Sequence, residues 1–149
     1  MKLLRVGQQG QEKVAVIDSE NKIRDLSSHI DDLNPDTINF KTLERLKKIN
    51  IETLPEISNN IRIGPCVNRP SNILCIGLNY SLHAEQTGSK LPDNPIVFNK
   101  SPDCLQGPND PIMKNKSQEK LDYEVELAMV IGREAKNVSE DKALDYVFG

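Results

Sequence analysis

Two segments of the chain carry side chains that could perform acid–base and metal chemistry. His83 follows an apolar stretch and a Gly/Asn turn at residues 73–80, and a short helix from Ser81 to Gly88 is expected to carry it. Farther along, Asp122, Glu124 and Glu126 alternate with apolar residues over residues 121–131. A strand there would place these three carboxylates on one face. Carboxylate oxygens are the ligands that Mg²⁺ prefers, and an imidazole can serve as a general base.

Each segment also has a simpler interpretation. An antiparallel strand with one solvated face alternates acidic and apolar residues in the same way. A single histidine near the start of a helix is more often an ordinary surface residue. The acidic face, however, continues into Ala128 and Val130. Unpaired carboxylates at the border of a core are costly, and a bound cation is one way to compensate them.

The overall composition argues against several classes of partner. The formal net charge is −3, acidic and basic residues are interspersed, and only 4% of residues are aromatic, so no nucleic-acid partner is expected. The longest apolar run, residues 127–131, is too short to span a membrane, and Arg5 interrupts the apolar N-terminus. We therefore expect a soluble cytoplasmic protein without a membrane partner. The cysteines lack metal-ligand spacing, which indicates reduced thiols.

The pattern of elements indicates an α+β protein with two domains. Residues 2–27 read as a β-meander, and apolar residues every third position from Phe40 to Ile49 predict a short amphipathic helix. Prolines between residues 55 and 72 mark a boundary, with residues 61–63 as a possible short strand. Beyond it we expect a buried strand at residues 73–76, a second strand at residues 95–100, and a long loop at residues 101–120. The strand at residues 121–131 and a last helix capped by Ser139 follow.

Taken in order, these segments resemble the fumarylacetoacetate hydrolase superfamily. The stretches that carry the resemblance are residues 73–80, 83–84, 92–98, 107–112, 121–132 and 137–149. The likeness is continuous over residues 61–149 and weaker over residues 1–60, which resemble the small N-terminal domain often found before the catalytic one. Leu78, where acylpyruvate hydrolases tend to carry Arg, favours the branch labelled ureidoglycolate lyase.

The resemblance implies a fold, a metal and an activity. The fold would be a small N-terminal β-meander/helix domain, residues 1–60, followed by the start of a mixed β-roll of the fumarylacetoacetate hydrolase type, residues 61–149. Glu124 and Glu126 would bind Mg²⁺ or Mn²⁺, and His83 would be the catalytic acid or base. The substrate would be a small 2-oxo or β-diketo carboxylic acid that chelates the metal, and the enzyme would be a homodimer. Lys100, Asp122 and Gln86 are candidates for the edge of the site.

Two departures from the family pattern set up an alternative. Members that hydrolyse or decarboxylate pair the histidine with a Glu three residues later, and this chain has Gln86 there. An amide can hydrogen-bond the imidazole but cannot accept its proton. The family also continues beyond this length to a third acidic ligand and a substrate-binding lysine. We therefore expect this chain to be a truncated or N-terminal portion of the enzyme. The alternative is a non-catalytic module that needs a partner chain to complete its fold.

Overall fold

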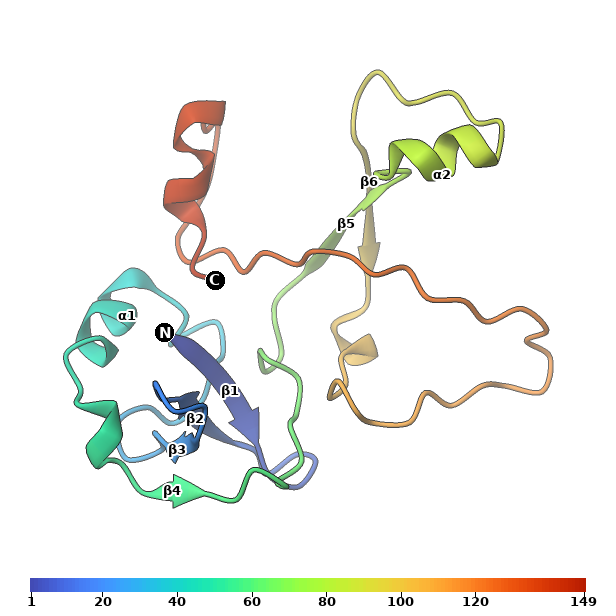
Figure 1. The fold of residues 1–149 in the computed structure, drawn as a ribbon. Helices are drawn as coiled ribbons and strands as arrows, with labels where there is room; N and C mark the ends of the chain where they lie inside the picture. The colour runs from blue at the N-terminus through green and yellow to red at the C-terminus, as the bar shows by residue number, and fades with distance from the viewer. The chain divides into compact units, whose positions relative to one another are not determined.

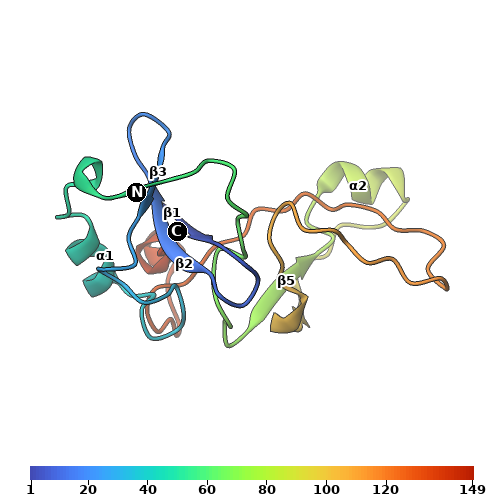
Figure 2. The ribbon, with the colours of Figure 1, turned by 90° about the horizontal axis from the view of Figure 1, so that it is seen from below.

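The computed structural model describes residues 1–149, which form two compact units. The first unit comprises Met1–Asn68 and Gln106–Gly149, and the second comprises Arg69–Leu105. None of the helices is both long enough and apolar enough to cross a lipid bilayer. Figures 1 and 2 show the course of the chain through the two units, which are described separately below.

The first unit is built on a four-stranded antiparallel sheet with the order β1-β2-β3-β4. The strands are β1 (Lys2–Val6), β2 (Lys13–Ile17), β3 (Ile23–Asp25) and β4 (Glu56–Ile57). The predicted β-meander of residues 2–27 is confirmed. Residues 61–63 form no strand and contribute one isolated bridge, between Val6 and Ile63.

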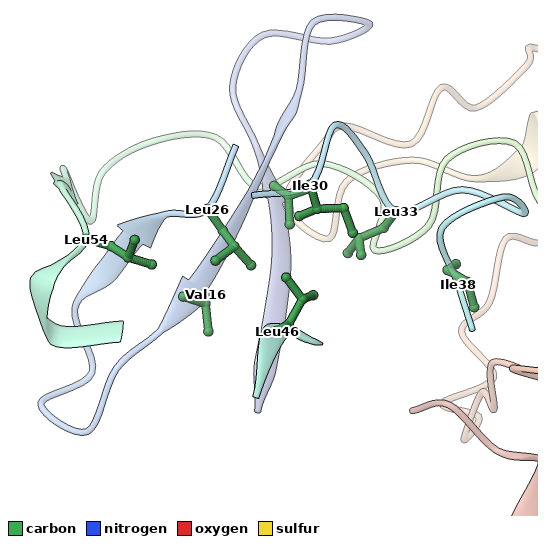
Figure 3. Packing of buried hydrophobic residues seen from close by; sticks show 8 residues of the cluster. Val16, Leu26, Ile30, Leu33, Ile38, Leu46 and Leu54 are labelled. Atoms are coloured by element: carbon green, nitrogen blue, oxygen red, sulfur yellow. The ribbon is translucent and has the colours of Figure 1, made fainter. Parts of the chain in front are cut away.

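The largest apolar core of the first unit lies where helix α1 (Phe40–Leu46) meets this sheet. Figure 3 shows side chains from the sheet, from α1 and from the intervening loops converging there. The buried members of this cluster are Val14, Val16, Leu26, Ile30, Leu33, Ile38, Leu46 and Leu54. The amphipathic helix predicted from Phe40 onward is confirmed, although it ends at Leu46. It begins at the Asn39 cap, whose side chain accepts a hydrogen bond from the backbone N–H of Thr42 at 2.9 Å.

The second unit pairs β5 (Ile73–Gly77) with β6 (Ile96–Lys100) in an antiparallel ribbon, and α2 (Ser81–Gln86) lies between them in sequence. Both predicted strands and the predicted helix are confirmed. Two details differ from expectation. The N-cap of α2 is Tyr80 rather than Ser81, and β5 is not buried, since Leu74 is 63% exposed. A helix needs no side-chain cap to begin, and a lone two-stranded ribbon cannot cover its own faces.

The strand predicted at residues 121–131 is wrong for this chain. The segment is extended but irregular, and its last residue, Ile131, makes one isolated bridge to Val147. A strand requires a neighbour to receive its backbone hydrogen bonds, and no other strand of the chain pairs with these residues. The predicted last helix is also corrected. Residues Glu140–Tyr146 form a 3₁₀ helix, η3, and the Ser139 side chain makes no cap hydrogen bond.

Candidate functional site

His83 is exposed to solvent on the short helix α2, whose conformation is defined by one buried residue and by its C-terminal hydrogen bonds. Ala84 is buried and fixes one face of the helix, while His83 and Gln86 are exposed. The helix ends in a Schellman motif, in which the Gly88 N–H donates to the backbone carbonyl of Glu85 and the Ser89 N–H donates to the backbone carbonyl of Ala84. Gly88 has a φ of +65°, which explains why the predicted glycine stands at this end. The local sequence therefore fixes where the imidazole emerges.

The turn that leads into α2 uses an unexpected residue. Gly77 ends β5 without a positive φ, and the left-handed conformation falls on Leu78, with a φ of +51°. A Cβ on Gly77 would lie 3.3 Å from the Ile96 side chain. Gly77 thus allows β5 and β6 to pack closely. Lys100, the last residue of β6, is paired in register with Ile73 and belongs to the same unit as His83.

The predicted acidic ligands lie in the first unit. Asp122, Glu124 and Glu126 are all exposed, and Asp122 accepts a hydrogen bond from the Tyr123 N–H at 2.9 Å. Val125 has a φ of +50°, which breaks the strict alternation that a strand would impose on its neighbours. The donor set suits a hard cation, because carboxylate oxygens are what Mg²⁺ and Mn²⁺ bind. No group of three or more His, Cys, Asp or Glu side chains forms a metal cluster in this chain.

The best-defined polar cluster in the first unit was not predicted. Arg62 donates from Nε to Asp110 Oδ1 at 2.8 Å and from Nη2 to Asp110 Oδ2 at 2.6 Å. Its Nη1 donates to Glu12 Oε1 at 2.8 Å and to the carbonyl of Gly7 at 3.1 Å. The guanidinium thereby connects the β1–β2 turn, which holds Gly7 and Glu12, with the turn at residues 107–110. The only sequence signal for this cluster was an arginine between two isoleucines, with a Gly-Pro-Asn-Asp turn much farther along the chain.

A second arginine extends this cluster into the sheet. Arg5 is 4% exposed and donates to Asp32 Oδ1 at 2.6 Å and to Glu12 Oε2 at 3.4 Å. Asn68 donates its side-chain amide to Asp32 Oδ2 at 2.7 Å. Every buried polar side-chain atom in the chain has a hydrogen-bond partner. Such buried charges are tolerated only when they are paired in this way.

The pairing changes the acidity of these carboxyl groups. The hydrogen bonds from Arg62 hold the pKa of Asp110 below its ordinary value, against a smaller opposing effect of burial. Burial alone would raise the pKa of Asp32, but the hydrogen bonds from Arg5 and Asn68 outweigh it and lower that pKa. For Glu12, burial likewise acts upward, and the hydrogen bond from Arg62 with the nearby charges brings the pKa down. All three groups are therefore held as carboxylates.

Comparison with known proteins identifies the family. The fumarylacetoacetate (FAA) hydrolase C-terminal family model matches residues 72–149. The chain is 48% identical over all of its length to a Burkholderia ambifaria protein named "Putative hydrolase", and 47% identical to one of the same name from Burkholderia lata. The chain therefore belongs to the fumarylacetoacetate hydrolase family.

Solved structures agree on the fold. The fumarylacetoacetate hydrolase of the psychrophile Exiguobacterium antarcticum superposes with a TM-score of 0.76 at 26% identity, covering 100% of this chain and 53% of that one. A protein of Mycobacterium smegmatis described as a putative HpcE protein superposes with a TM-score of 0.74 at 22% identity, covering 99% of this chain and 52% of that one. The α+β architecture with antiparallel sheets is thus that of the family. The chain spans about half the length of the curated relatives it matches, 53% of the Burkholderia ambifaria protein.

Proposed function

We propose that this chain belongs to a Mg²⁺-dependent (or Mn²⁺-dependent) hydrolase or lyase that acts on a small 2-oxo or β-diketo acid. The reaction would be C–C bond cleavage, decarboxylation or hydration, in a cytoplasmic homodimer. The observation that carries the proposal is the family match, because residues 72–149 include His83, Glu124 and Glu126 together.

Each candidate residue has a role that follows from its chemistry. Glu124 and Glu126 would hold the cation, which when bound would polarise a substrate carbonyl and stabilise an enolate. His83, exposed on α2, would take a proton from water or from the substrate. Lys100 would attract the substrate carboxylate by its charge. Asp122 and Gln86 would lie at the edge of the site, with Gln86 placed to hydrogen-bond the imidazole rather than to receive its proton.

The metal assignment is tested by turnover with Mg²⁺ or Mn²⁺ and a panel of 2-oxo acids. Glu124→Gln and Glu126→Gln are each expected to lower metal-dependent kcat/KM by roughly a hundredfold, since ligand removal disrupts transition-state charge stabilisation. Glu119→Gln is the matched control, because this exposed glutamate lies nearby in the same segment. Turnover that is the same in all three variants would refute the assignment.

The role of His83 is tested in the same assay. His83→Asn is expected to reduce kcat by roughly 10²-fold to 10⁴-fold, the usual contribution of a positioned acid–base group. Glu85→Gln, on the same short helix and also exposed, is the control. An unchanged kcat in His83→Asn would remove His83 from the mechanism.

A second candidate function is a non-catalytic module completed by a partner chain. The specific observation in its favour is the exposure of apolar side chains on both strands of the second unit. Leu74, Ile76, Ile96, Val97 and Phe98 are all at least 43% exposed. This alternative predicts weak metal affinity, because two carboxylates leave most of an octahedral shell to water. Tight stoichiometric binding of Mg²⁺ by the chain alone would exclude it.

A further inference from the structure

The segment that carries the predicted acidic ligands is attached to the first unit at both of its ends. Residues 111–129 are exposed throughout and contain no helix or strand. Their hydrogen bonds in the stretch before the acidic residues are local, such as that from the Asn115 N–H to Gln118 at 2.7 Å. The two ends of this segment, near residues 107–110 and near residues 130–133, attach it to the folded body of the unit.

The first anchor is the turn at residues 107–110. Arg62 donates two hydrogen bonds to the Asp110 carboxylate, and the Gly107 N–H donates to the same carboxylate at 2.8 Å. The turn closes through the Asp110 N–H, which donates to the Gly107 carbonyl at 3.1 Å. Gly107 is buried, and a Cβ there would overlap the carbonyl oxygen of Ile63. The turn thus lies directly against the backbone beside Arg62.

Arg62 is itself held from the opposite side. Glu12 accepts from its Nη1 at 2.8 Å, and the Glu12 side chain is only 4% exposed. The backbone of Arg62 also accepts from the Gly7 N–H at 2.9 Å. The guanidinium binds two carboxylates and a carbonyl through hydrogen bonds from Nε, Nη1 and Nη2, a planar arrangement that a lysine ammonium cannot reproduce.

The second anchor is where the segment returns. The Val130 N–H donates to the Gly149 carbonyl, and the Phe148 N–H donates to the Val130 carbonyl, both at 2.7 Å. Val130 and Phe148 also pack against the main apolar core. Beyond them, the Arg133 guanidinium lies 4.2 Å from the ring centroid of Tyr146 and 5.4 Å from that of Phe40 in α1. This anchor rests on packing and backbone pairing and does not involve Arg62.

We propose that Arg62 is a positioning residue for the acidic segment, acting through Asp110. By fixing the turn at residues 107–110, it sets the point from which the chain runs to Glu124 and Glu126. A loop held at both ends has fewer conformations to lose when its carboxylates converge on a cation. Arg62 therefore favours metal binding without touching the metal. The inference rests on the proposed function, in which Glu124 and Glu126 are the ligands.

The test compares Arg62→Ala and Arg62→Lys with the matched control Arg24→Ala. Arg24 is in the same unit, donates to Asp18 at 2.7 Å and to a backbone carbonyl at 3.3 Å, and has no contact with the acidic segment's anchors. The first readout is amide hydrogen exchange at Gly107 and Asp110, followed by NMR. The second is affinity for Mn²⁺ alone, measured by electron paramagnetic resonance in titration.

Arg62→Ala should speed exchange at Gly107 and Asp110 by roughly tenfold, the effect of losing one charge-assisted hydrogen-bond pair. It should weaken Mn²⁺ binding by about three- to tenfold, with Arg62→Lys between it and the native protein. Arg24→Ala should lower the melting temperature while leaving both readouts unchanged. A merely structural role for Arg62 would instead give the same Mn²⁺ affinity in the Arg62 and Arg24 variants, and that result would overturn the inference.

A parallel Glu124→Gln, Glu126→Gln double variant separates the two proposals. If it loses Mn²⁺ binding while Arg62→Ala retains the native affinity, the positioning role fails and the metal assignment stands. If the double variant binds Mn²⁺ normally, the metal assignment fails, and the positioning role for metal binding fails with it. Native exchange rates at Gly107 and Asp110 in Arg62→Ala would refute the anchor itself, whatever the metal does.

Discussion

At the scale of single residues, the spacing of His83 and Gln86 along α2 bears most directly on catalysis. Both are exposed on α2, and their spacing of three residues places them on one helical face. A carboxylate at position 86 would stabilise the imidazolium that forms when His83 accepts a proton, which an amide cannot do. We expect Gln86→Glu to raise kcat for a 2-oxo acid by about tenfold. Steady-state kinetics with Glu85→Gln as a control would check this, and an unchanged or lower kcat would contradict it.

The carboxylates that are paired with Arg5 and Arg62 should make the free energy of unfolding decrease at acid pH. The pKa values of Glu12, Asp32 and Asp110 lie below their ordinary values of 4.5, 3.8 and 3.8 in the folded chain. The unfolded state therefore takes up protons first as the pH falls. The stabilisation is present in full above those ordinary values and is lost as the pH falls through the lower folded-state values. Urea denaturation at pH 7, 5, 4 and 3 should give a free energy of unfolding that is the same at pH 7 and 5 and then decreases toward pH 3.

Asp32→Asn provides the variant for that experiment. It removes one group of lowered pKa, so the decline between pH 4 and pH 3 should be shallower than in the native chain, on a lower starting stability. Asp36→Asn, in the same loop but exposed, is the control. A decline of equal steepness in the native and Asp32→Asn chains would show that the cluster does not govern acid sensitivity.

The close approach at Gly107 gives a residue-scale prediction that requires no metal. A methyl group there would collide with the Ile63 carbonyl and with Asp110, so the turn must move away from Arg62. We expect Gly107→Ala to lower the free energy of unfolding by about 1–3 kcal/mol, as forced overpacking usually does. Gln106→Ala, at the exposed neighbouring position, should change it by less than about 0.5 kcal/mol. Equal stability of the two variants in urea would mean that the turn is not tightly seated.

At the scale of elements, α1 and α2 differ in how much their leucine side chains contribute to the stability of the folded state. Leu46 of α1 is fully buried in the main core, whereas Leu82 of α2 is 70% exposed. Leu46→Ala should therefore cost about 2–5 kcal/mol, the usual range for a truncated core leucine. Leu82→Ala should cost less than about 0.5 kcal/mol. Urea denaturation of both variants would measure the difference, and a similar cost for both would contradict the assignment of the core.

The same contrast explains which elements the sequence could predict. The β-meander and α1 follow from local apolar periods and turns, and β1, β2 and β3 each pair with the next strand along the chain. The strand at residues 121–131 was predicted from an equally clear alternation. That pattern records which face is apolar, but pairing depends on a partner strand, which no local pattern supplies. The positive φ of Val125 lies in the middle of that segment and had no sequence signal.

The candidate site was predictable to a similar extent. The placement of His83 on a short helix ending at Gly88 followed from turn and cap residues, and the structure has that helix. The Arg62 cluster could not be found, because its members lie at positions 12, 62 and 110 and meet only through the fold. Charged residues far apart in the chain resemble ordinary solvated ones until the sheet brings them together. The roles of Glu124, Glu126 and Lys100 stay predictions.

At the scale of the whole molecule, one face of the two-stranded sheet in the second unit is apolar and exposed to solvent. Leu74 and Ile76 lie two residues apart on β5, so their side chains share one face of the sheet. Val97 of β6 is directly paired with Ile76 and therefore lies on the same face. All three are exposed, at 63%, 43% and 58%. An exposed, contiguous apolar face of this kind promotes association, and the same two strands also leave unpaired edges. We therefore expect the chain to associate with itself at rising concentration.

Sedimentation velocity over a range of protein concentrations would measure this association. The double variant Leu74→Lys, Val97→Lys should shift the distribution toward the monomer, because each lysine places a charge on the apolar face without removing a backbone hydrogen bond of the ribbon. Lys90→Glu changes the charge at an exposed residue of the same unit that lies outside both strands, and it should leave association unchanged. A native chain that remained monomeric at all concentrations would show that this face is stable in water. Association that persisted in the double variant would place the contact on a different surface.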